Sequence, residues 1–310
     1  GTYINNRAGD PQIQPERQEE FEGGIDATLA NGRAELNLTL YQRNIRDLIL
    51  EQTVAPSVGQ ELRVFGNGGS LRNRGVEASL TLQPVQSRDL NWVFRTTFFA
   101  NRAKITSLNV PPFQTGGFAL FLGTYQIEQD SSPTQIFGTV GNDAAGNGIP
   151  GKVGDANPDF QMTFSNDIDF RRFTLGFLFD WKHGGDIINL TEFLYDNGAV
   201  SKDYTADGAA RFNLLGQGFT YPYVQDGSYL KLREVNLSYN LPDRLASSLF
   251  GRGIRYARLS LTGRNLLRFT PYRGLDPEVS NFANQAIVRN IDVAPFPPSR
   301  SFFFSIDLGF

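Results

Sequence analysis

The final segment of the chain, residues 301–310, alternates between two kinds of side chain. One face carries large apolar side chains at Phe302, Phe304, Ile306, Leu308 and Phe310, while Phe303 is the lone aromatic on the opposite face. A period of two puts alternate side chains on opposite faces of a β-strand, so one face meets an apolar medium and the other a polar one. The pattern recurs along the chain. It predicts an all-β fold, a transmembrane antiparallel β-barrel with lipid outside and water inside.

Nine segments show this alternation. The segment 158–170 is the clearest, because its even positions are mostly large and apolar while its odd positions are polar. Strands of about ten residues are long enough to cross a bilayer when they are tilted. The expected strands span about 20–30, 33–47, 74–84, 90–104, 158–170, 172–183, 228–241, 254–268 and 301–310.

The connections alternate between short and long. Asn31-Gly32 is a tight hairpin signal, and residues 242–253 predict one short helix with Pro242 at its start and Gly251 at its end. Outer-membrane barrels have short periplasmic turns and long extracellular loops, so the C-terminus is expected on the periplasmic side. The remaining short links lie at 87–89 and 171–172, and the long connections are expected over about 51–73, 109–157, 184–227 and 269–299.

Aromatic residues make up 13% of the chain, which suits the girdles that flank the lipid-facing band of a barrel. In the expected frame, one such girdle lies near the periplasmic interface and contains Trp92, Phe170, Phe173, Tyr239 and Phe310. Residues 117–127 are a further strand candidate, with 132–140 as a possible partner. A β-ribbon inside an extracellular loop is the simpler interpretation, because it preserves the alternation of turns and loops.

Composition excludes several classes of function. No apolar run approaches 18 residues, so no transmembrane helix is expected. The net charge of −3 provides no basic surface for nucleic acid. The chain has no cysteine and a single histidine, His183, which leaves no histidine triad or histidine metal site and favours a polar rim position for that residue. Residues 142–148 lack the alternating acidic ligands and terminal Glu of a calcium loop. No enzyme, metal or cofactor is predicted.

Two sets of side chains are candidates for function. The polar positions of the strands are expected to line the lumen, with charges of both signs that suit salt links better than a single-sign ion filter. They are Glu22, Asp26, Glu35, Arg43, Glu77, Arg95, Asp167, Asp169, Asp180, Lys182, Glu234, Arg258 and Arg264. The simpler interpretation of each one is a solvated wall residue.

Aromatic residues in the long loops are the substrate-binding candidates, because they can stack on sugar faces. They are Phe113, Phe118, Phe121, Tyr125, Tyr195, Tyr204, Tyr221, Tyr223 and Tyr272. The alternative is that they pack the loops against themselves. A helix is expected over 186–197, with Gly198 as its C-cap.

Six ordered motifs resemble the SusC/RagA family of TonB-dependent outer-membrane transporters. The fullest match is Asp226-Gly-Ser-Tyr-Leu-Lys-Leu-Arg-Glu-Val-Asn-Leu-Ser-Tyr-Asn-Leu-Pro242. The others are Asn73-Arg-Gly-Val-Glu77, Val153-Gly-Asp-Ala-Asn-Pro-Asp-Phe160, Gly184-Gly-Asp-Ile187, the run from Gly263-Arg-Asn-Leu266 to Tyr272-Arg-Gly-Leu-Asp-Pro-Glu-Val-Ser280, and Pro297-Pro-Ser-Arg-Ser-Phe302 with the phenylalanines that follow it.

The resemblance implies a 22-stranded barrel with an N-terminal plug domain and a TonB box. In that frame residues 1–310 are expected to be about the last nine strands, with the plug and earlier strands absent from this sequence. It further implies energy-dependent import of oligosaccharides or peptides across the outer membrane. The implied partners are a SusD-like surface lipoprotein, which helix 186–197 is one candidate to contact, the TonB complex acting through the plug, and outer-membrane lipid.

Two other interpretations stay open at this point. A free-standing small outer-membrane porin or surface-binding barrel would need an even strand number and its own closure. A soluble β-rich carbohydrate-binding module also shows alternating strands, although its strands are usually shorter and its loops more even.

Overall fold

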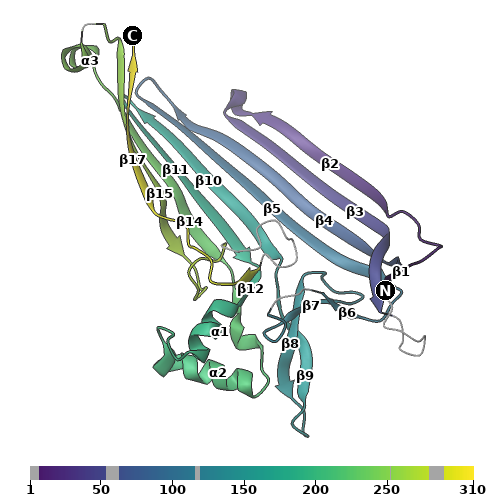
Figure 1. Ribbon diagram of the computed structural model, residues 1–310. Helices are drawn as coiled ribbons and strands as arrows, with labels where there is room; N and C mark the ends of the chain where they lie inside the picture. The colour runs from purple at the N-terminus through teal and green to yellow at the C-terminus, as the bar shows by residue number, and fades with distance from the viewer. Residues whose placement is uncertain (1–6, 54–62, 116–118, 252, 279–289) are drawn as a thin grey trace, which may run out of the picture.

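A single antiparallel sheet dominates the computed structural model, which describes residues 7–53, 63–115, 119–251, 253–278 and 290–310. The hydrogen-bonded order is β17-β15-β14-β11-β10-β5-β4-β3-β2, so strands that follow one another along the chain are neighbours (Figure 1). All nine expected strands are confirmed. They are β2 (Arg17–Leu29), β3 (Ala34–Thr53), β4 (Arg63–Gln86), β5 (Leu90–Leu108), β10 (Pro158–Phe170), β11 (Phe173–Gly184), β14 (Tyr229–Asn240), β15 (Tyr256–Phe269) and β17 (Ser301–Gly309).

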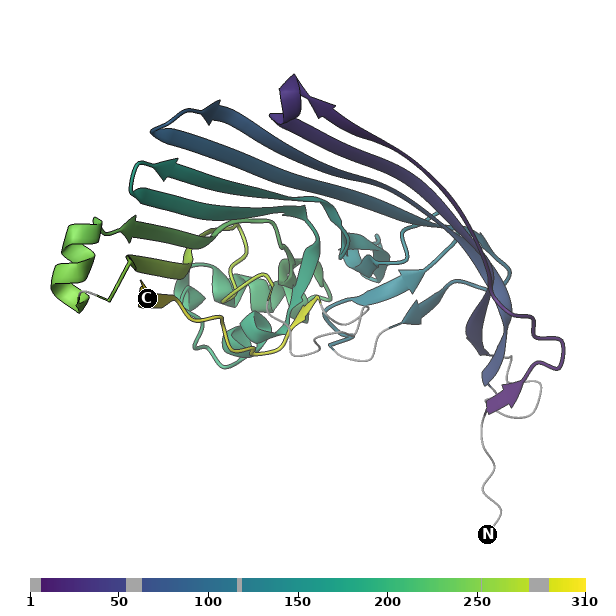
Figure 2. The same cartoon turned by 90° about the horizontal axis from the view of Figure 1, so that it is seen from above.

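The sheet arches like a section of barrel wall, and the folded loops lie on its inner side (Figure 2). Within the described residues β2 and β17 are the two ends of this path, so the wall is open. A short strand, β1 (Arg7–Gly9), pairs in parallel with the start of β4. None of the helices in the described ranges has the length and apolar character needed to cross a membrane.

The two faces of the sheet differ as the alternation predicts. The outer face is apolar yet exposed: Phe302, Phe304 and Phe21 keep 68%, 65% and 69% of their surface accessible. Such a face is unfavourable in water and suits lipid. Asn166 is the polar exception on this face of β10, and the Trp92 indole N–H donates a 3.0 Å hydrogen bond to its side-chain oxygen.

Short links join the strands at one end of the sheet, which we call the turn end. Ala30, Asn31 and Gly32 form the β2–β3 turn, a 3-10 turn labelled η1 (Ala30–Gly32), with φ of 53°, 56° and 85°. The helix α3 (Asp243–Phe250) joins β14 to β15, with Pro242 as N-cap and Gly251 as C-cap at φ 107°. The predicted aromatic cluster lies at this end, and the Phe173 and Tyr239 rings are 4.6 Å apart.

The expected long connection over 51–73 is wrong. Strands β3 and β4 pair with each other as far as Thr53 and Arg63, well beyond the ends predicted from alternation. Both faces of a strand that projects beyond the membrane meet water, so the apolar alternation that marks a membrane strand disappears while the backbone pairing continues. Residues 54–62 lie outside the described ranges.

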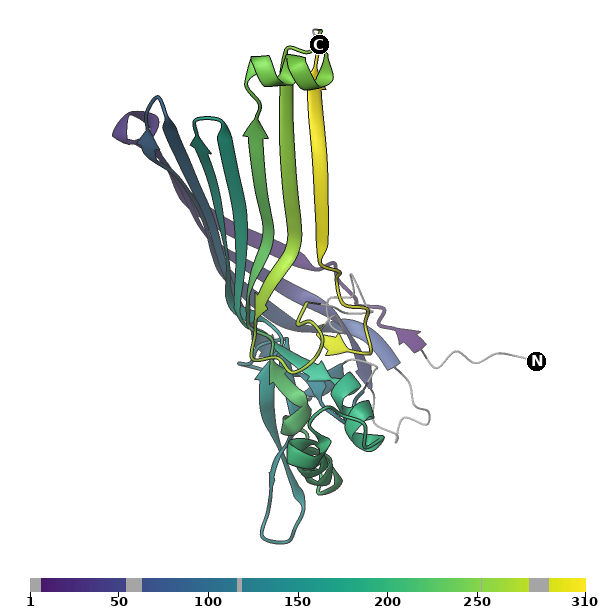
Figure 3. The ribbon, with the colours of Figure 1, turned by 90° about the vertical axis from the view of Figure 1, so that its left-hand side faces the viewer.

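The connection 109–157 folds into its own four-stranded sheet, in the order β6-β7-β8-β9. The expected ribbon inside this loop is confirmed, because Tyr125 pairs with Ile136. The β8–β9 hairpin projects away from the wall (Figure 3). The four strands are β6 (Phe113–Thr115), β7 (Thr124–Ile127), β8 (Gln135–Asn142) and β9 (Gly148–Asp155).

The helix expected over 186–197 is half right. Residues Asp186–Asn189 form strand β12, because Ile188 pairs with Val224 on one side and Ile291 on the other. Helix α1 follows over Leu190–Asn197, with the Asn189 side chain accepting a hydrogen bond from the Glu192 backbone N–H. Gly198 is the C-cap but has φ −81°, and Ala199 adopts the left-handed conformation at φ 54°.

The remaining elements of this region come from two connections. After α1 the chain forms a π-helix, η3 (Tyr204–Gly208), which runs directly into α2 (Ala209–Gly216). The 3-10 turn η4 (Tyr221–Tyr223) and strand β13 (Val224–Asp226) lead back to the wall, and β16 (Ile291–Asp292) arrives from the connection before β17. Together with β6–β9 and residues 270–278 of the connection after β15, we call β12, β13, β16, α1, α2, η3 and η4 the loop module.

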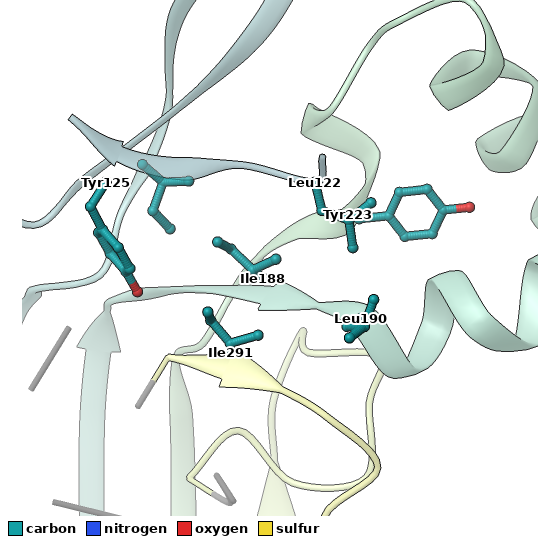
Figure 4. Close-up of a cluster of buried hydrophobic side chains, with 7 residues drawn as sticks. Leu122, Tyr125, Ile188, Leu190, Tyr223 and Ile291 are labelled. Carbon is teal, nitrogen blue, oxygen red and sulfur yellow. The ribbon is translucent and has the colours of Figure 1, made fainter. Parts of the chain in front are cut away.

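The main buried core lies in the loop module and not in the wall. Ile188, Leu190 and Ile291 meet Leu122, Tyr125, Ile136 and Tyr223 from the other loops (Figure 4). A wall one sheet thick has little interior of its own, because its outer face meets lipid. The loops that cover its end therefore carry the compact core.

One motif glycine in the wall has a clear steric role. The Tyr41 ring lies across Gly75 on the neighbouring strand, and a Cβ atom built there would be 2.2 Å from the ring. The Asn101 amide then donates a 3.2 Å hydrogen bond to the Tyr41 hydroxyl.

Gly75→Val is expected to destabilise the barrel by about 1–3 kcal/mol, because the ring must leave its position. Urea unfolding of the intact receptor in lipid vesicles measures the change. Gly23→Val is the matched control, since an added Cβ at Gly23 meets nothing within 4 Å. Equal losses for both variants would show that the Tyr41 ring is not the cause.

Candidate functional site

Charged side chains of the inner face of the wall pair across neighbouring strands. Arg95 contacts Asp167 at 2.5 Å, and Arg264 contacts Glu234 at 2.9 Å. The Arg258 guanidinium donates to the side chain of Asn240. These groups lie on the polar face, as the alternation places them, but the two ion pairs are about half exposed and such pairs contribute little stability.

A second set of charges on this face surrounds the buried Lys231. Of this set only Asp180 was predicted from the sequence, as a lumen residue. Lys231 is 4% exposed and its ammonium lies 2.6 Å from the Asp276 carboxylate. It also contacts Glu278, as does Arg233. Arg233 in turn reaches Asp180 at 2.5 Å. We call Asp180, Tyr229, Lys231, Arg233, Asp276 and Glu278 the wall network.

Two segments far apart in the sequence build the wall network. The basic side chains and Tyr229 come from β14, whereas Asp276 and Glu278 lie in the connection that follows β15. An irregularity at Arg233 inserts an extra residue in β14 relative to β11. The Tyr229 hydroxyl donates to Glu278 at 2.7 Å, and the Lys231 ammonium lies 4.8 Å from the Tyr229 ring. The wall network thus fastens this connection to the inner wall.

The stability of the wall network is expected to depend on pH because of Glu278. Burial alone would raise the pKa of its carboxyl, but hydrogen bonds from Arg233, Lys231 and Tyr229 outweigh burial and lower the pKa to about 2. When folding lowers the pKa of a carboxyl, the ionised carboxylate stabilises the folded state. That contribution is complete at pH values above the pKa of the unfolded chain, and it is lost as the pH falls through the pKa of the folded protein.

The connection that carries Glu278 is therefore expected to stay bound to the inner wall from pH 7 down to about pH 4.5, which is near the pKa of a free Glu. It should dissociate from the wall as the pH falls toward 2. A fluorophore on Leu275→Cys in the intact receptor reports the release, because Leu275 is half exposed beside the network. Glu278→Gln should abolish the transition in this acid range. An unchanged transition in that variant would contradict the assignment to Glu278.

A second network of ion pairs lies inside the loop module around the buried Arg211. Arg211 of α2 is 7% exposed, and its guanidinium makes two hydrogen bonds to Asp196, of 2.9 and 3.0 Å, and two to Asp203, of 2.7 and 2.9 Å. Arg273 donates to both carboxylate oxygens of Glu192 at 2.8 and 2.9 Å. The hydrogen bond from Arg211 lowers the pKa of Asp203. These pairs tie α1, α2 and the connection after β15 into one unit.

Motif residues hold the loops to one another at the rim of the wall. The Asp186 carboxylate accepts a 2.7 Å hydrogen bond from the backbone N–H of Asp155. A Cβ atom at Gly154 would be 2.7 Å from that carboxylate, which explains a glycine there. The Asn290 amide bridges the carbonyls of Ala156 and Asp186 at 2.8 and 3.2 Å. Burial raises the pKa of Asp186.

A cavity of about 540 Å³ opens between α1, the turn before η3 and the connection after β15. Its volume lies in the range of small-molecule sites. The cavity is lined by Asn189, Thr191, Glu192, Tyr195, Ser201, Lys202, Asp203, Arg273, Gly274 and Leu275.

The loop aromatics divide by exposure. Tyr125, Tyr223 and Tyr272 are at most 4% exposed and pack the loop module itself, and the Tyr272 hydroxyl donates to Asp292. Phe113 and Tyr204 are half-buried, and Phe118 lies outside the described residues. The aromatic candidates with a substantial free surface in the described loops are Phe121, Tyr195 and Tyr221, with 52%, 47% and 45% exposed.

Other predicted positions are placed as follows. Glu35 is exposed on the polar face of β3. His183 lies at the loop end of β11, where its Nδ1 is 3.0 Å from the Asp159 carboxylate and its ring stacks on Phe160. The described residues contain no cluster of three or more side chains suited to a metal. At the tip of the β8–β9 hairpin the Asp143 carboxylate accepts hydrogen bonds from Ala145 and Asn147, which shape the turn.

The open, two-faced sheet and the folded loops at one end define the wall of an outer-membrane β-barrel. Comparison with known proteins specifies the family. Residues 1–266 match the family described as "TonB dependent receptor-like, beta-barrel", and the chain belongs to that family. It is therefore part of the β-barrel of an outer-membrane protein.

Individual proteins to which the chain is similar also belong to this class. The chain is 27% identical to TonB-dependent receptor P3 of Formosa agariphila over 100% of this chain and 36% of the relative. It is 22% identical to TonB-dependent receptor SusC of Bacteroides thetaiotaomicron, over 98% of this chain and 33% of SusC. The structure of the RagAB peptide transporter superposes with a TM-score of 0.74 at 23% identity, covering 98% of this chain and 36% of that one. The chain thus spans about a third of the length of these relatives.

Proposed function

We propose that this chain forms the C-terminal wall and extracellular loops of an energised outer-membrane importer for oligosaccharides or peptides. In this proposal residues 1–310 are one part of a 22-stranded barrel whose plug and remaining strands lie elsewhere in the transporter. A SusD-like lipoprotein covers the extracellular mouth, and the TonB complex acts on the plug. No enzymatic step is assigned to the chain.

The observation that carries the proposal is the loop module fastened to the inner wall. A passive pore needs an open mouth, whereas here one buried and one partly buried ion pair hold loop residues against the lumen side of β14. A rigid module at the mouth suits a transporter that must position a large substrate and a lid above it.

Two features bear on the alternatives. The exposed apolar outer face and the family membership favour a membrane wall over a soluble carbohydrate-binding module. In the described residues the sheet path ends at β2 and β17 without closing. An open edge in lipid leaves backbone groups unpaired, which disfavours a free-standing small barrel made from these strands alone.

Affinity purification of the tagged native protein from outer membranes tests the proposal. The expected result is a polypeptide much larger than 34.5 kDa that co-purifies with a surface lipoprotein. Cells should also lose uptake of its substrate when TonB is removed. A native polypeptide of 34.5 kDa without such a lipoprotein, or uptake that is independent of TonB, would contradict it.

A further inference from the structure

The cavity beside α1 has walls that are held in place before any ligand arrives. On one side of the cavity, Asp203 is held by an ion pair with Arg211, which also pairs with Asp196 of α1. Glu192 on the other side is fixed by Arg273. A site whose side chains are already ordered loses less entropy when it binds. The cavity is therefore preorganised.

The charges around the cavity balance. The lining carries two carboxylates, Glu192 and Asp203, and two cationic groups, Arg273 and Lys202. Arg273 pairs with Glu192, and Asp203 is paired behind the wall with Arg211, which also holds the buried Asp196. A strongly charged ligand would have to displace one of these pairs. An uncharged polar ligand would not.

The cavity offers a ligand an exposed aromatic ring, an apolar patch, and hydrogen-bond donors and acceptors. Tyr195 and Leu275 each keep 47% of their surface exposed at the cavity. The Asp203 side chain is 37% exposed and retains lone pairs on its carboxylate. The Lys202 ammonium supplies hydrogen-bond donors. A ring that carries hydroxyls on its edge and C–H groups on its face matches this set.

Two local features set this cavity apart from an ordinary surface hollow. The Ser201 hydroxyl in its wall is buried and has no hydrogen-bond partner, which is costly in a folded protein. The segment that follows Asp203 is a π-helix, η3, and such wide turns are rare and concentrate at functional sites. Both features lie where the chain bends around the cavity.

We propose that this cavity is a subsite for one uncharged sugar ring, with Tyr195 as the stacking platform and Asp203 and Lys202 as hydrogen-bonding groups. The inference rests on the proposed function and narrows its substrate class to neutral glycans. The cavity lies in the loop module, outside the wall network. A chain of ion pairs and backbone through Arg273 and Asp276 links the two.

The test uses the intact receptor, purified in detergent, and isothermal titration with neutral oligosaccharides of glucose, mannose, xylose and galactose. At least one of them is expected to bind. Tyr195→Ala should weaken that binding tenfold or more, and Tyr195→Phe should retain it because the ring remains. Leu194→Ala is the matched control and should stay within twofold, since Leu194 is 46% exposed on the same helix, α1, but does not line the cavity.

Three outcomes would overturn the subsite: no neutral oligosaccharide binds, binding is confined to peptides, or Tyr195→Ala binds as tightly as the parent. Co-purification of the lipoprotein and TonB-dependent uptake are measured in parallel on the same variants. If co-purification and TonB-dependent uptake persist while sugar binding at the cavity is absent, the proposed transporter function is retained and only the sugar subsite is wrong.

Discussion

Lys231→Met is expected to destabilise the receptor by about 3–5 kcal/mol, because removing one partner of a buried ion pair leaves the other charge without compensation. The Asp276 carboxylate is 5% exposed and would lose its 2.6 Å contact with the ammonium. Glu278 would lose the same partner. Urea unfolding of the intact receptor in lipid vesicles measures the change in free energy.

Arg95→Met provides the control on the same face of the wall. Its ion pair with Asp167 is 2.5 Å long, but both side chains are about half exposed, so the expected loss is only about 0–1 kcal/mol. Combining Lys231→Met with Asp276→Asn and Glu278→Gln should recover part of the stability, since no buried charge is then stranded. Equal losses for Lys231→Met and Arg95→Met would contradict the distinction between buried and exposed pairs.

Leu38→Arg is expected to cost about 2–4 kcal/mol if Leu38 meets the bilayer midplane. Leu38 lies on β3 between Ile25 and Ala78 of the neighbouring strands, on the apolar outer face. Asn37→Arg, one residue earlier, points to the polar face beside Ser79 and should be nearly neutral. Folding of the intact receptor into vesicles, followed by its gel mobility shift on heating, gives both values.

This pair of variants differs by one position in sequence and by one side of the sheet in space. Similar losses for the two would mean that the faces are assigned wrongly. A larger loss for Asn37→Arg would mean that they are reversed.

The wall could be predicted because its signal is local and repeated. Each strand separates lipid from water, so apolar and polar side chains alternate along it, and Asn31-Gly32 marks a turn through its own backbone preference. Alternation does not predict the parts of a strand that extend beyond the lipid into water. Beyond the membrane β3 and β4 continue in water on both sides, and the alternation that would have revealed them is absent.

The loop module could not be predicted in the same way. Asp186–Asn189 looked helical with the residues after it, but Ile188 lies between Val224 and Ile291, and those strand partners are remote in sequence. Similarly, Tyr223 and Tyr272 were candidates for substrate binding, with packing inside the loops as the alternative, and it took segments from elsewhere in the chain to show that they are buried. The motif around Lys231 and the motif around Asp276 were both visible, but nothing in either indicated that they touch.

Local pattern was enough to predict the two-faced wall, the alternation of turns and loops, and the family resemblance, because these depend on neighbours within a strand or turn. Long-range packing was needed to establish which charges are buried, how α1, α2 and the connection after β15 contact one another, and where a cavity remains. Those features arise from contacts between residues that can lie more than a hundred positions apart, as Asn290 and Ala156 do. Such contacts are set by how the loops pack over the wall and leave no periodic trace in the chain.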